Sequence, residues 1–237
     1  DLVVTGVVSA TRDLAITAGG SIYTVQDLDT GMLPSLTGVN VKLSAIQDIA
    51  LKEQALNTNA EKVDAFSLLG GVHIKEQNGL KNINVLAKKD ISVTATNGNI
   101  VFDNIISQNL NSNSVVKISS EKGSIISENK NNTIQSDTVE LMAVNTIGTN
   151  NAKINTTAKN ILIDNKSSQN SGSYVKNSTS INNLNISTLG TATLVEFTGG
   201  ELAYNLDGNN HLSPCKKTHN RSQTNLTQRT QSSKANH

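Results

Sequence analysis

The sequence of 237 residues is poor in aromatic side chains, which make up 3% of it, and it contains no tryptophan. Few large side chains are therefore present to fill the core of a compact globule, and we expect a thin core of Ile, Val, Leu and Ala. The single cysteine, Cys215, excludes an intrachain disulfide framework, and no apolar run reaches the ~20 residues of a membrane-spanning helix.

The formal net charge of +1 is unevenly distributed along the chain. Residues 211–237 hold five basic side chains and no acid, which leaves 15 basic and 19 acidic side chains in residues 1–210. A mildly acidic body argues against a nucleic-acid-binding face. The chain begins at Asp1 and shows no basic start followed by an apolar segment, so we expect an export signal to lie on further sequence of a longer protein.

Short segments in which apolar and polar residues alternate follow one another along the body of the chain. The first phrase, VVSATRDLAITAGGSIYT, contains alternating strands separated by polar corners, and INVLAKKDISVTATNGNIVF repeats the same pattern further on. The phrase VNVKLSAIQDIALKE keeps the alternation without a glycine corner. The three phrases match in phase when Ile16, Ile49 and Ile91 are aligned. Looser copies are found at residues 115–127, 138–149, 152–165 and 182–197.

Two all-β architectures compete for this pattern. Asn97-Gly98 between alternating strands is a strong hairpin signal and would suit an antiparallel meander. The other corners, however, share only one polar segment every five to nine residues, which is typical of a parallel β-helix whose coils stack about 4.8 Å apart. Recurrence at roughly 20 residues favours such a solenoid and predicts a body about 50 Å long over residues 1–207.

The pattern stops near residue 207. Residues 208–237 contain almost no apolar side chains and no alternation, so they bury too little surface to offset the entropy of ordering. The sequence therefore predicts a disordered, basic and polar C-terminal tail.

Three stretches resemble the filamentous-haemagglutinin-like repeat proteins of Gram-negative surfaces, which include autotransporter passengers and two-partner-secretion substrates. The stretches are ITAGGSI (16–22), VTATNGNI (93–100) and VELMAVNTIGTNNAKINTTAKNILIDN (139–165). The resemblance covers most of residues 1–205. It implies a right-handed parallel β-helix, a cell-surface, outer-membrane-associated or secreted location, and export through an outer-membrane translocator. It also implies adhesion, with host-cell or matrix molecules, glycans and neighbouring repeats of a longer chain as partners, and it offers no catalytic motif.

His73 and three aspartates are the first candidates for chemistry. His73 is the one histidine of the body, and alternation in GGVHIKE places it opposite Val72 and Ile74, where we expect a solvent-facing strand residue. Asp13, Asp48 and Asp90 recur at corners that look equivalent and could stack into an acidic ladder. Corner aspartates more simply bond their own backbone, and this is the interpretation we favour.

The remaining candidates are weaker. A sugar platform needs exposed aromatic side chains, and the candidates are Tyr23, Tyr174 and Tyr204. His211, Cys215 and His219 have the spacing of metal ligands on a helix, but Pro214 would interrupt that helix and we regard the spacing as incidental.

The sequence therefore predicts a structural and adhesive segment that is not an enzyme, with no catalytic residue, no metal and no cofactor, and with binding residues that the sequence does not identify. The alternatives are a β-helical polysaccharide-acting enzyme or carbohydrate-binding module, and a passive stalk. A groove that gathers at least two carboxylates with a basic or aromatic side chain would favour the enzyme.

Overall fold

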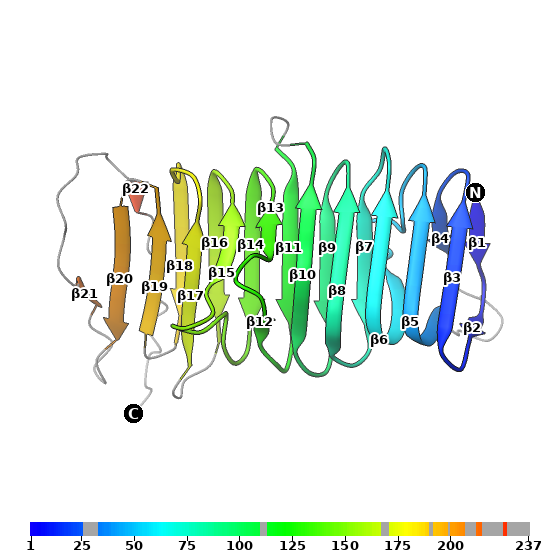
Figure 1. Ribbon diagram of the computed structural model, residues 1–237, viewed down its shortest axis with the longest axis horizontal. Coiled ribbons are helices and arrows are strands. Elements are labelled where there is room, and N and C mark those ends of the chain that lie inside the picture. The colour runs from blue at the N-terminus through cyan, green and yellow to red at the C-terminus, as the bar shows by residue number, and fades with distance from the viewer. Residues whose placement is uncertain are drawn as a thin grey trace, which may run out of the picture.

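The computed structural model describes residues 1–25, 33–109, 113–166, 171–189 and 192–198, and the backbone of 200–206, 212–214 and 225–226. Strands and the turns between them make up these residues, and no helix occurs in them. Accordingly, the described part of the chain contains no helix long and apolar enough to cross a membrane. The chain coils as a right-handed β-solenoid of about eight turns, from the N-terminal end to the C-terminal end of Figure 1.

The strands are short and evenly spread along the chain. Their bounds are β1 (Leu2–Val4), β2 (Val7–Ser9), β3 (Asp13–Ala18), β4 (Ile22–Thr24), β5 (Ser35–Ala45), β6 (Leu56–Ser67), β7 (Val72–Glu76), β8 (Leu80–Ala87), β9 (Ile91–Ala95), β10 (Ile100–Ser107), β11 (Val115–Ser120), β12 (Ile125–Ser127), β13 (Thr133–Gln135), β14 (Thr138–Ala143), β15 (Ile154–Thr157), β16 (Asn160–Asn165), β17 (Gly172–Asn177), β18 (Asn183–Thr188), β19 (Ala192–Phe197), β20 (Gly200–Leu206), β21 (Leu212–Pro214) and β22 (Asn225–Leu226).

Two long faces form the walls of the solenoid. Face 1 consists of β3, the second halves of β5 and β6, then β8, β10, β13, β15, β17 and β19. Face 2 consists of β7, β9, β11, β14, β16 and β18. Neighbouring strands within each face are parallel, as Figure 1 shows, because the chain returns to the same face once in every coil. The predicted parallel β-helix is therefore confirmed.

Inward side chains of successive coils lie directly above one another. One column on the side of face 2 is entirely aliphatic and buried, and its members are Ile22, Ile49, Val72, Ile91, Val116, Val139, Ile161 and Leu184. Each buried aliphatic side chain contributes ~1.5–3 kcal/mol of transfer free energy. Stacked aliphatic columns thus supply the core that aromatic residues would supply in a globule.

The register corrects the predicted alignment of the repeats. Ile49 and Ile91 do share a column, with Val72 between them, but the member of that column near the start of the chain is Ile22. Ile16 pairs with Leu43 on face 1 instead. The predicted alignment is displaced by one strand because the strands of both faces alternate in the same way, so the pattern alone does not distinguish them.

The coils are fewer and longer than predicted. Successive members of the aliphatic column are separated by as few as 19 residues, from Val72 to Ile91, and by as many as 27, from Ile22 to Ile49. About eight turns at ~4.8 Å each give a body of ~40 Å, rather than the predicted ~50 Å. Residues 50–55 illustrate the added length, since they form a turn closed by the Leu51–Gln54 bridge between the column and β6.

The C-terminal end changes from parallel to antiparallel pairing. β20 pairs antiparallel with β19, and β21 pairs antiparallel with β20, so this hairpin lies against the last coil. β22 pairs parallel with β18. The predicted disordered tail, residues 208–237, lies outside the described residues apart from β21 and β22.

Candidate functional site

His73 lies on the outer side of β7, as the alternation predicts, but the prediction that it faces solvent is wrong. Only 7% of its surface is exposed. Its Nδ1 is 3.0 Å from the Ser92 Oγ of the next coil, and its Nε2 would stand 3.2 Å from a Cβ on Gly71. Burial lowers the pKa of His73, and the nearby carboxylates of Asp90 and Asp48 oppose that shift. His73 is therefore a packed side chain of the coil stack.

The corner aspartates bond to the backbone of the following coil. Asp48 Oδ1 accepts a hydrogen bond of 2.7 Å from the Gly71 N–H, and Asp90 Oδ1 accepts one of 2.9 Å from the Val115 N–H. Each bond satisfies a donor that the strands leave unpaired at the corner. Both aspartates lie at corners, as the favoured interpretation has it, but the prediction that each bonds its own backbone is wrong, because the bonded N–H belongs to the next coil.

The acidic ladder of three aspartates, the alternative to the favoured corner interpretation, does not form. Asp48 and Asp90 lie two coils apart with Gly71 between them, since Ile49 pairs with Val72 and Val72 with Ile91. Asp13 begins β3 in a different column, where its Oδ1 accepts a hydrogen bond of 2.6 Å from Asn40 Nδ2. The three carboxylates therefore do not converge on one site.

His73 and Ser92 are the residue types that serve as base and nucleophile in serine-dependent catalysis, and their side chains are in contact. A catalytic serine, however, needs its histidine oriented by a third group and accessible to substrate. The two residues are direct cross-strand neighbours of β7 and β9, and their contact joins one coil to the next. Oδ1 of Asp48 and of Asp90 is bonded to backbone N–H groups, as described above. The contact therefore has the geometry of the other side-chain hydrogen bonds that join neighbouring coils.

Glu76 is a buried carboxylate that the search for chemical motifs missed. It is fully buried at the end of β7 and accepts hydrogen bonds from Thr58 Oγ1 at 2.6 Å, the Ala60 N–H at 3.1 Å and the Asn78 N–H at 3.0 Å. Burial raises the pKa of Glu76, and these hydrogen bonds oppose the shift. A signal was present in the sequence, because alternation places Glu76 in phase with the inward residues Val72 and Ile74.

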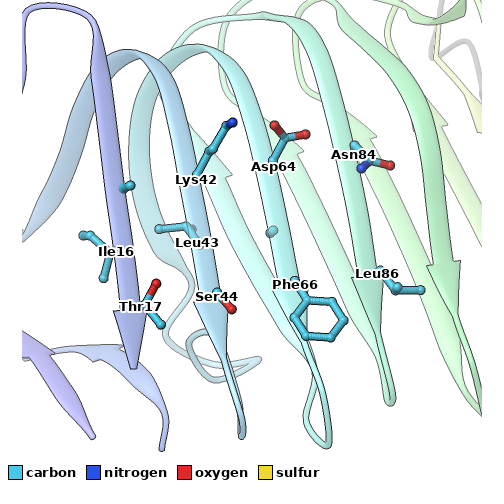
Figure 2. Close-up of a pocket in the computed structure, with 11 residues that line it drawn as sticks. Ile16, Thr17, Lys42, Leu43, Ser44, Asp64, Phe66, Asn84 and Leu86 are labelled. Carbon is cyan, nitrogen blue, oxygen red and sulfur yellow. The ribbon is translucent and has the colours of Figure 1, made fainter. Parts of the chain in front are cut away.

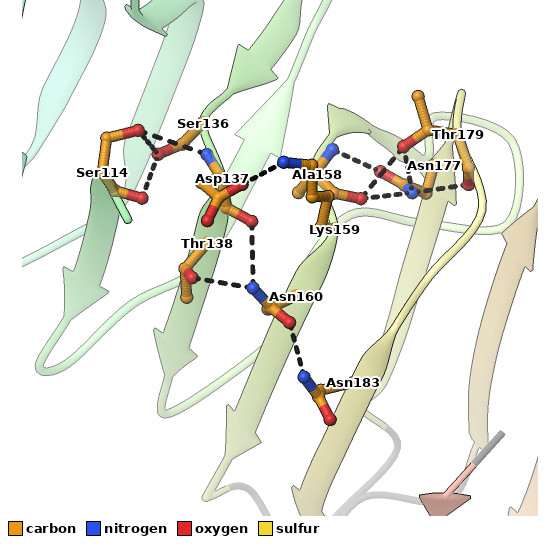
Figure 3. Close-up of polar contacts among 10 residues, drawn as sticks. All are labelled: Ser114, Ser136, Asp137, Thr138, Ala158, Lys159, Asn160, Asn177, Thr179 and Asn183. Atoms are coloured by element: carbon orange, nitrogen blue, oxygen red, sulfur yellow. Dashed lines mark hydrogen bonds and ion pairs between the residues drawn. The ribbon is translucent and has the colours of Figure 1, made fainter. Parts of the chain in front are cut away.

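Asn177 repeats the arrangement of Glu76 further along the solenoid. Its Oδ1 accepts hydrogen bonds from Thr156 Oγ1 at 2.8 Å and from the Ala158 N–H at 3.0 Å. Its Nδ2 donates to the carbonyls of Ala158 and Thr179, as Figure 3 shows. In both coils a Thr-x-Ala segment donates to a buried oxygen one coil later, which identifies Glu76 as a corner support rather than an isolated acid.

Polar side chains also join the coils along face 2 and its edge. Ser136 Oγ donates to the Ser114 carbonyl at 2.8 Å, and Asn183 Nδ2 donates to Asn160 Oδ1 at 2.7 Å (Figure 3). Lys159 Nζ lies 3.0 Å from Asp137 Oδ1. The abundance of Asn, Ser and Thr is thus used in part for bonds between coils.

Two hollows lie on the outer surface of the early coils. The larger, of about 400 Å³, lies on face 1 beside Lys42, Asp64 and Phe66 (Figure 2). The smaller, of about 260 Å³, lies beside Tyr23 and Asp48. Each hollow contains one carboxylate, so neither meets the criterion of two carboxylates that would favour a polysaccharide-acting enzyme. In the ranges given above, no group of three or more His, Cys, Asp or Glu side chains is placed to hold a metal ion.

The other predicted candidates are dispersed. Tyr23 lies on β4 and Tyr174 on β17, both partly exposed, at opposite ends of the solenoid. Only the backbone of Tyr204, on β20, is described. His211, Cys215 and His219 lie outside the described residues. The described tyrosines therefore do not form one platform.

No protein-family model, no curated protein and no solved structure matches the sequence. The fold is therefore established by the strand pairings alone.

Proposed function

We propose that this chain is a structural and adhesive segment of a bacterial surface or secreted protein of the filamentous-haemagglutinin-like kind. The observation that carries the proposal is a solenoid of about eight parallel coils whose outward positions stack in register from coil to coil. Such a body presents long side faces, over which weak polar contacts with a surface partner can be summed. Export through an outer-membrane translocator and contact with host-cell, matrix or glycan partners belong to the same proposal.

The arrangement of polar side chains supports binding in preference to catalysis. Catalysis requires two or three groups that converge on one substrate bond. His73, Asp48 and Asp90 are instead engaged in bonds between coils, and the hollow on face 1 offers one carboxylate beside Lys42 and Phe66.

The test measures binding and turnover on the same preparation. The 237-residue chain is applied to immobilised matrix proteins, to a glycan panel and to epithelial cells, and is incubated separately with acidic and neutral polysaccharides. We expect saturable binding to at least one surface and no new reducing or unsaturated ends. His73→Ala, checked for folding, should retain the binding.

Two results would contradict the proposal. Product formation that is lost in folded Asp48→Asn or Asp90→Asn variants would assign the chain to the polysaccharide-acting enzymes. Absence of both turnover and binding, with a folded chain, would assign it a passive spacer role. The asparagine variants keep a side-chain acceptor at the corner, so they separate loss of the carboxylate from loss of the fold.

A further inference from the structure

The outer side of face 1 carries two rows of side chains across four coils, and in one row two small side chains are followed by two large ones. In one row, parallel pairing aligns Thr17 of β3, Ser44 of β5, Phe66 of β6 and Leu86 of β8. The row beside it aligns Ala15, Lys42, Asp64 and Asn84. Figure 2 shows both rows: Thr17 and Ser44 are small beside Phe66 and Leu86, and the long side chain of Lys42 lies next to Asp64. The hollow of about 400 Å³ extends along these rows.

Large apolar side chains are exposed along the same rows and at the corner that follows them. Phe66 is 39% exposed, and at the corner Ile46 is 42% and Leu68 is 49% exposed. Leu69, which donates its N–H to the Ile46 carbonyl, is also exposed. Contiguous apolar surface of this kind marks an interaction site more often than chance exposure does.

We propose that the outer side of face 1, over β3, β5, β6 and β8, is the interface of a two-fold symmetric homodimer. Consider an axis that runs parallel to the strands, midway between β5 and β6, with the two copies turned face to face. This rotation exchanges β5 with β6, and β3 with β8. Each residue of β5 therefore lies opposite its own cross-strand neighbour from the partner, as an isologous interface requires.

The shapes of the two copies are complementary under this rotation. Phe66 lies over Ser44 of the partner subunit, and Leu86 lies over Thr17 of the partner subunit. Large side chains of the later coils thus enter the hollow over the small side chains of the earlier coils. Ile46 lies opposite the partner's Leu68 at the corner, so apolar surface covers apolar surface. Packed sheets stand ~10 Å apart, which side chains of these sizes can fill.

The charges are complementary as well. Lys42 lies opposite the partner's Asp64, and Asp64 lies opposite the partner's Lys42, because the two residues are direct neighbours in the register. In the described part of the chain, neither side chain makes an ion pair or a hydrogen bond within its own copy. Two reciprocal ion pairs therefore form without breaking any contact of the separate copies, which favours a second copy as the occupant of this surface.

Sedimentation velocity of the 237-residue chain tests the dimer across the micromolar concentration range. We expect a concentration-dependent shift from monomer to dimer. Phe66→Ser should weaken the dimer at least ~tenfold, since a central aromatic side chain is removed from a hollow of the partner. Phe66 is not part of the core, so the variant should keep the circular dichroism spectrum and the urea midpoint of the parent chain.

A charge exchange tests the geometry of the interface. Lys42→Asp places a carboxylate opposite the partner's Asp64, and Asp64→Lys places an ammonium group opposite the partner's Lys42. Each variant alone should therefore dimerise at least ~tenfold more weakly. An equimolar mixture of the two variants should dimerise again, because every facing pair in the mixed dimer has opposite charges. Repulsion inside one copy is the same with or without mixing, so it does not explain such a recovery.

Lys75→Asp reverses an exposed charge on β7, in face 2, and should leave the dimer unchanged. A chain that stays monomeric at all concentrations overturns the proposal. A dimer that is indifferent to Phe66→Ser, or a mixture of the two charge variants that stays monomeric, assigns self-association to a different surface and also overturns it.

Discussion

Glu76 and Asn177 show how a single side chain supports a corner of the solenoid. Each residue places one oxygen between a threonine hydroxyl and an alanine N–H of the preceding coil. The amide of Asn177 also donates to two carbonyls, whereas the second oxygen of Glu76 accepts from the Asn78 N–H. A carboxylate thus brings a titratable charge into a position that an uncharged amide fills elsewhere. This charge makes the stability of the fold depend on pH.

The variant Glu76→Gln isolates this dependence. Burial raises the folded-state pKa of Glu76 above its usual 4.5, so its stabilising contribution is complete below that pH and declines as the pH rises through the folded-state pKa. The glutamine does not titrate and keeps one oxygen for Thr58 and Ala60. We therefore expect the urea midpoint of the parent chain, relative to the variant, to fall as the pH rises from below 4.5 through the folded-state pKa of Glu76.

The control for this experiment is Glu121→Gln, which removes the charge of an exposed carboxylate at a corner of the next coils. It should change the midpoint by less than Glu76→Gln does at each pH, because solvent screens an exposed charge. A parent midpoint that rises relative to the Glu76→Gln variant over the same interval would show that the hydrogen bonds of Glu76 outweigh its burial.

At the scale of the element, the corners determine how closely the coils approach. Asp1, Asp48, Asp90 and Asn99 each accept a backbone N–H of the following coil with a side-chain oxygen. These bonds hold the corner of one coil directly above the corner of the next. A residue that lies between two such corners has little space for a side chain of its own.

Gly71→Ala tests this close approach. A Cβ on Gly71 would stand 2.6 Å from the Asp90 carbonyl oxygen, which is itself held by the Val72 N–H, so the backbone of one coil must shift. We expect a loss of ~1–3 kcal/mol in the free energy of unfolding, measured by urea denaturation.

Gly19→Ala is the matched control, because no atom lies within 4 Å of a Cβ at that corner. It should change the free energy of unfolding by less than ~0.5 kcal/mol. Equal losses in the two variants would mean that the corners tolerate a side chain by relaxing, and that coil spacing is set by the strands alone.

The sequence predicted the class of element but not its assignment to a face. Alternation in ISVTA correctly places Ile91, Val93 and Ala95 inward, because the strand period is two on either face. The same period cannot distinguish the two faces, and for that reason Ile16 was aligned with the wrong column. The insertion at residues 50–55 was also invisible, since a turn inside a coil has the same polar composition as a corner.

The corner positions of two candidate residues were predictable from the sequence. Asp48 and Asp90 accept backbone N–H groups, as Asp does at corners, but the choice of a partner in the next coil does not follow from the sequence. The burial of His73 does not follow from alternation, because it depends on Ser92 and Gly71, which belong to the neighbouring coil and the adjoining corner. Contacts between coils require the register, and the register depends on coil lengths that vary from 19 residues upward.

At the scale of the whole molecule, stability is the sum of contacts between adjacent coils. Each coil contacts chiefly the coil before it and the coil after it, so removal of material beyond the last full coil should affect little of the core. The buried aliphatic residues of the described chain extend to Val195 on β19. Residues 208–237 contribute to the described structure only β21, of three residues, and β22, of two.

Deletion of residues 208–237 is therefore expected to leave the fold intact. The free energy of unfolding, measured by urea denaturation, should change by less than ~1 kcal/mol, because only short edge pairings to β20 and β18 are lost. The slope of the unfolding free energy against urea should stay constant, since it scales with the surface that unfolding exposes and the coils that bury this surface are retained.

Limited proteolysis of the full chain should cleave first at Lys216, Lys217 and Arg221, which lie in a stretch without core residues. Protection of these three sites equal to that of the strands, together with a lower slope in the shortened chain, would show that the segment buries surface against the solenoid and would contradict its sequence-based interpretation as a disordered tail.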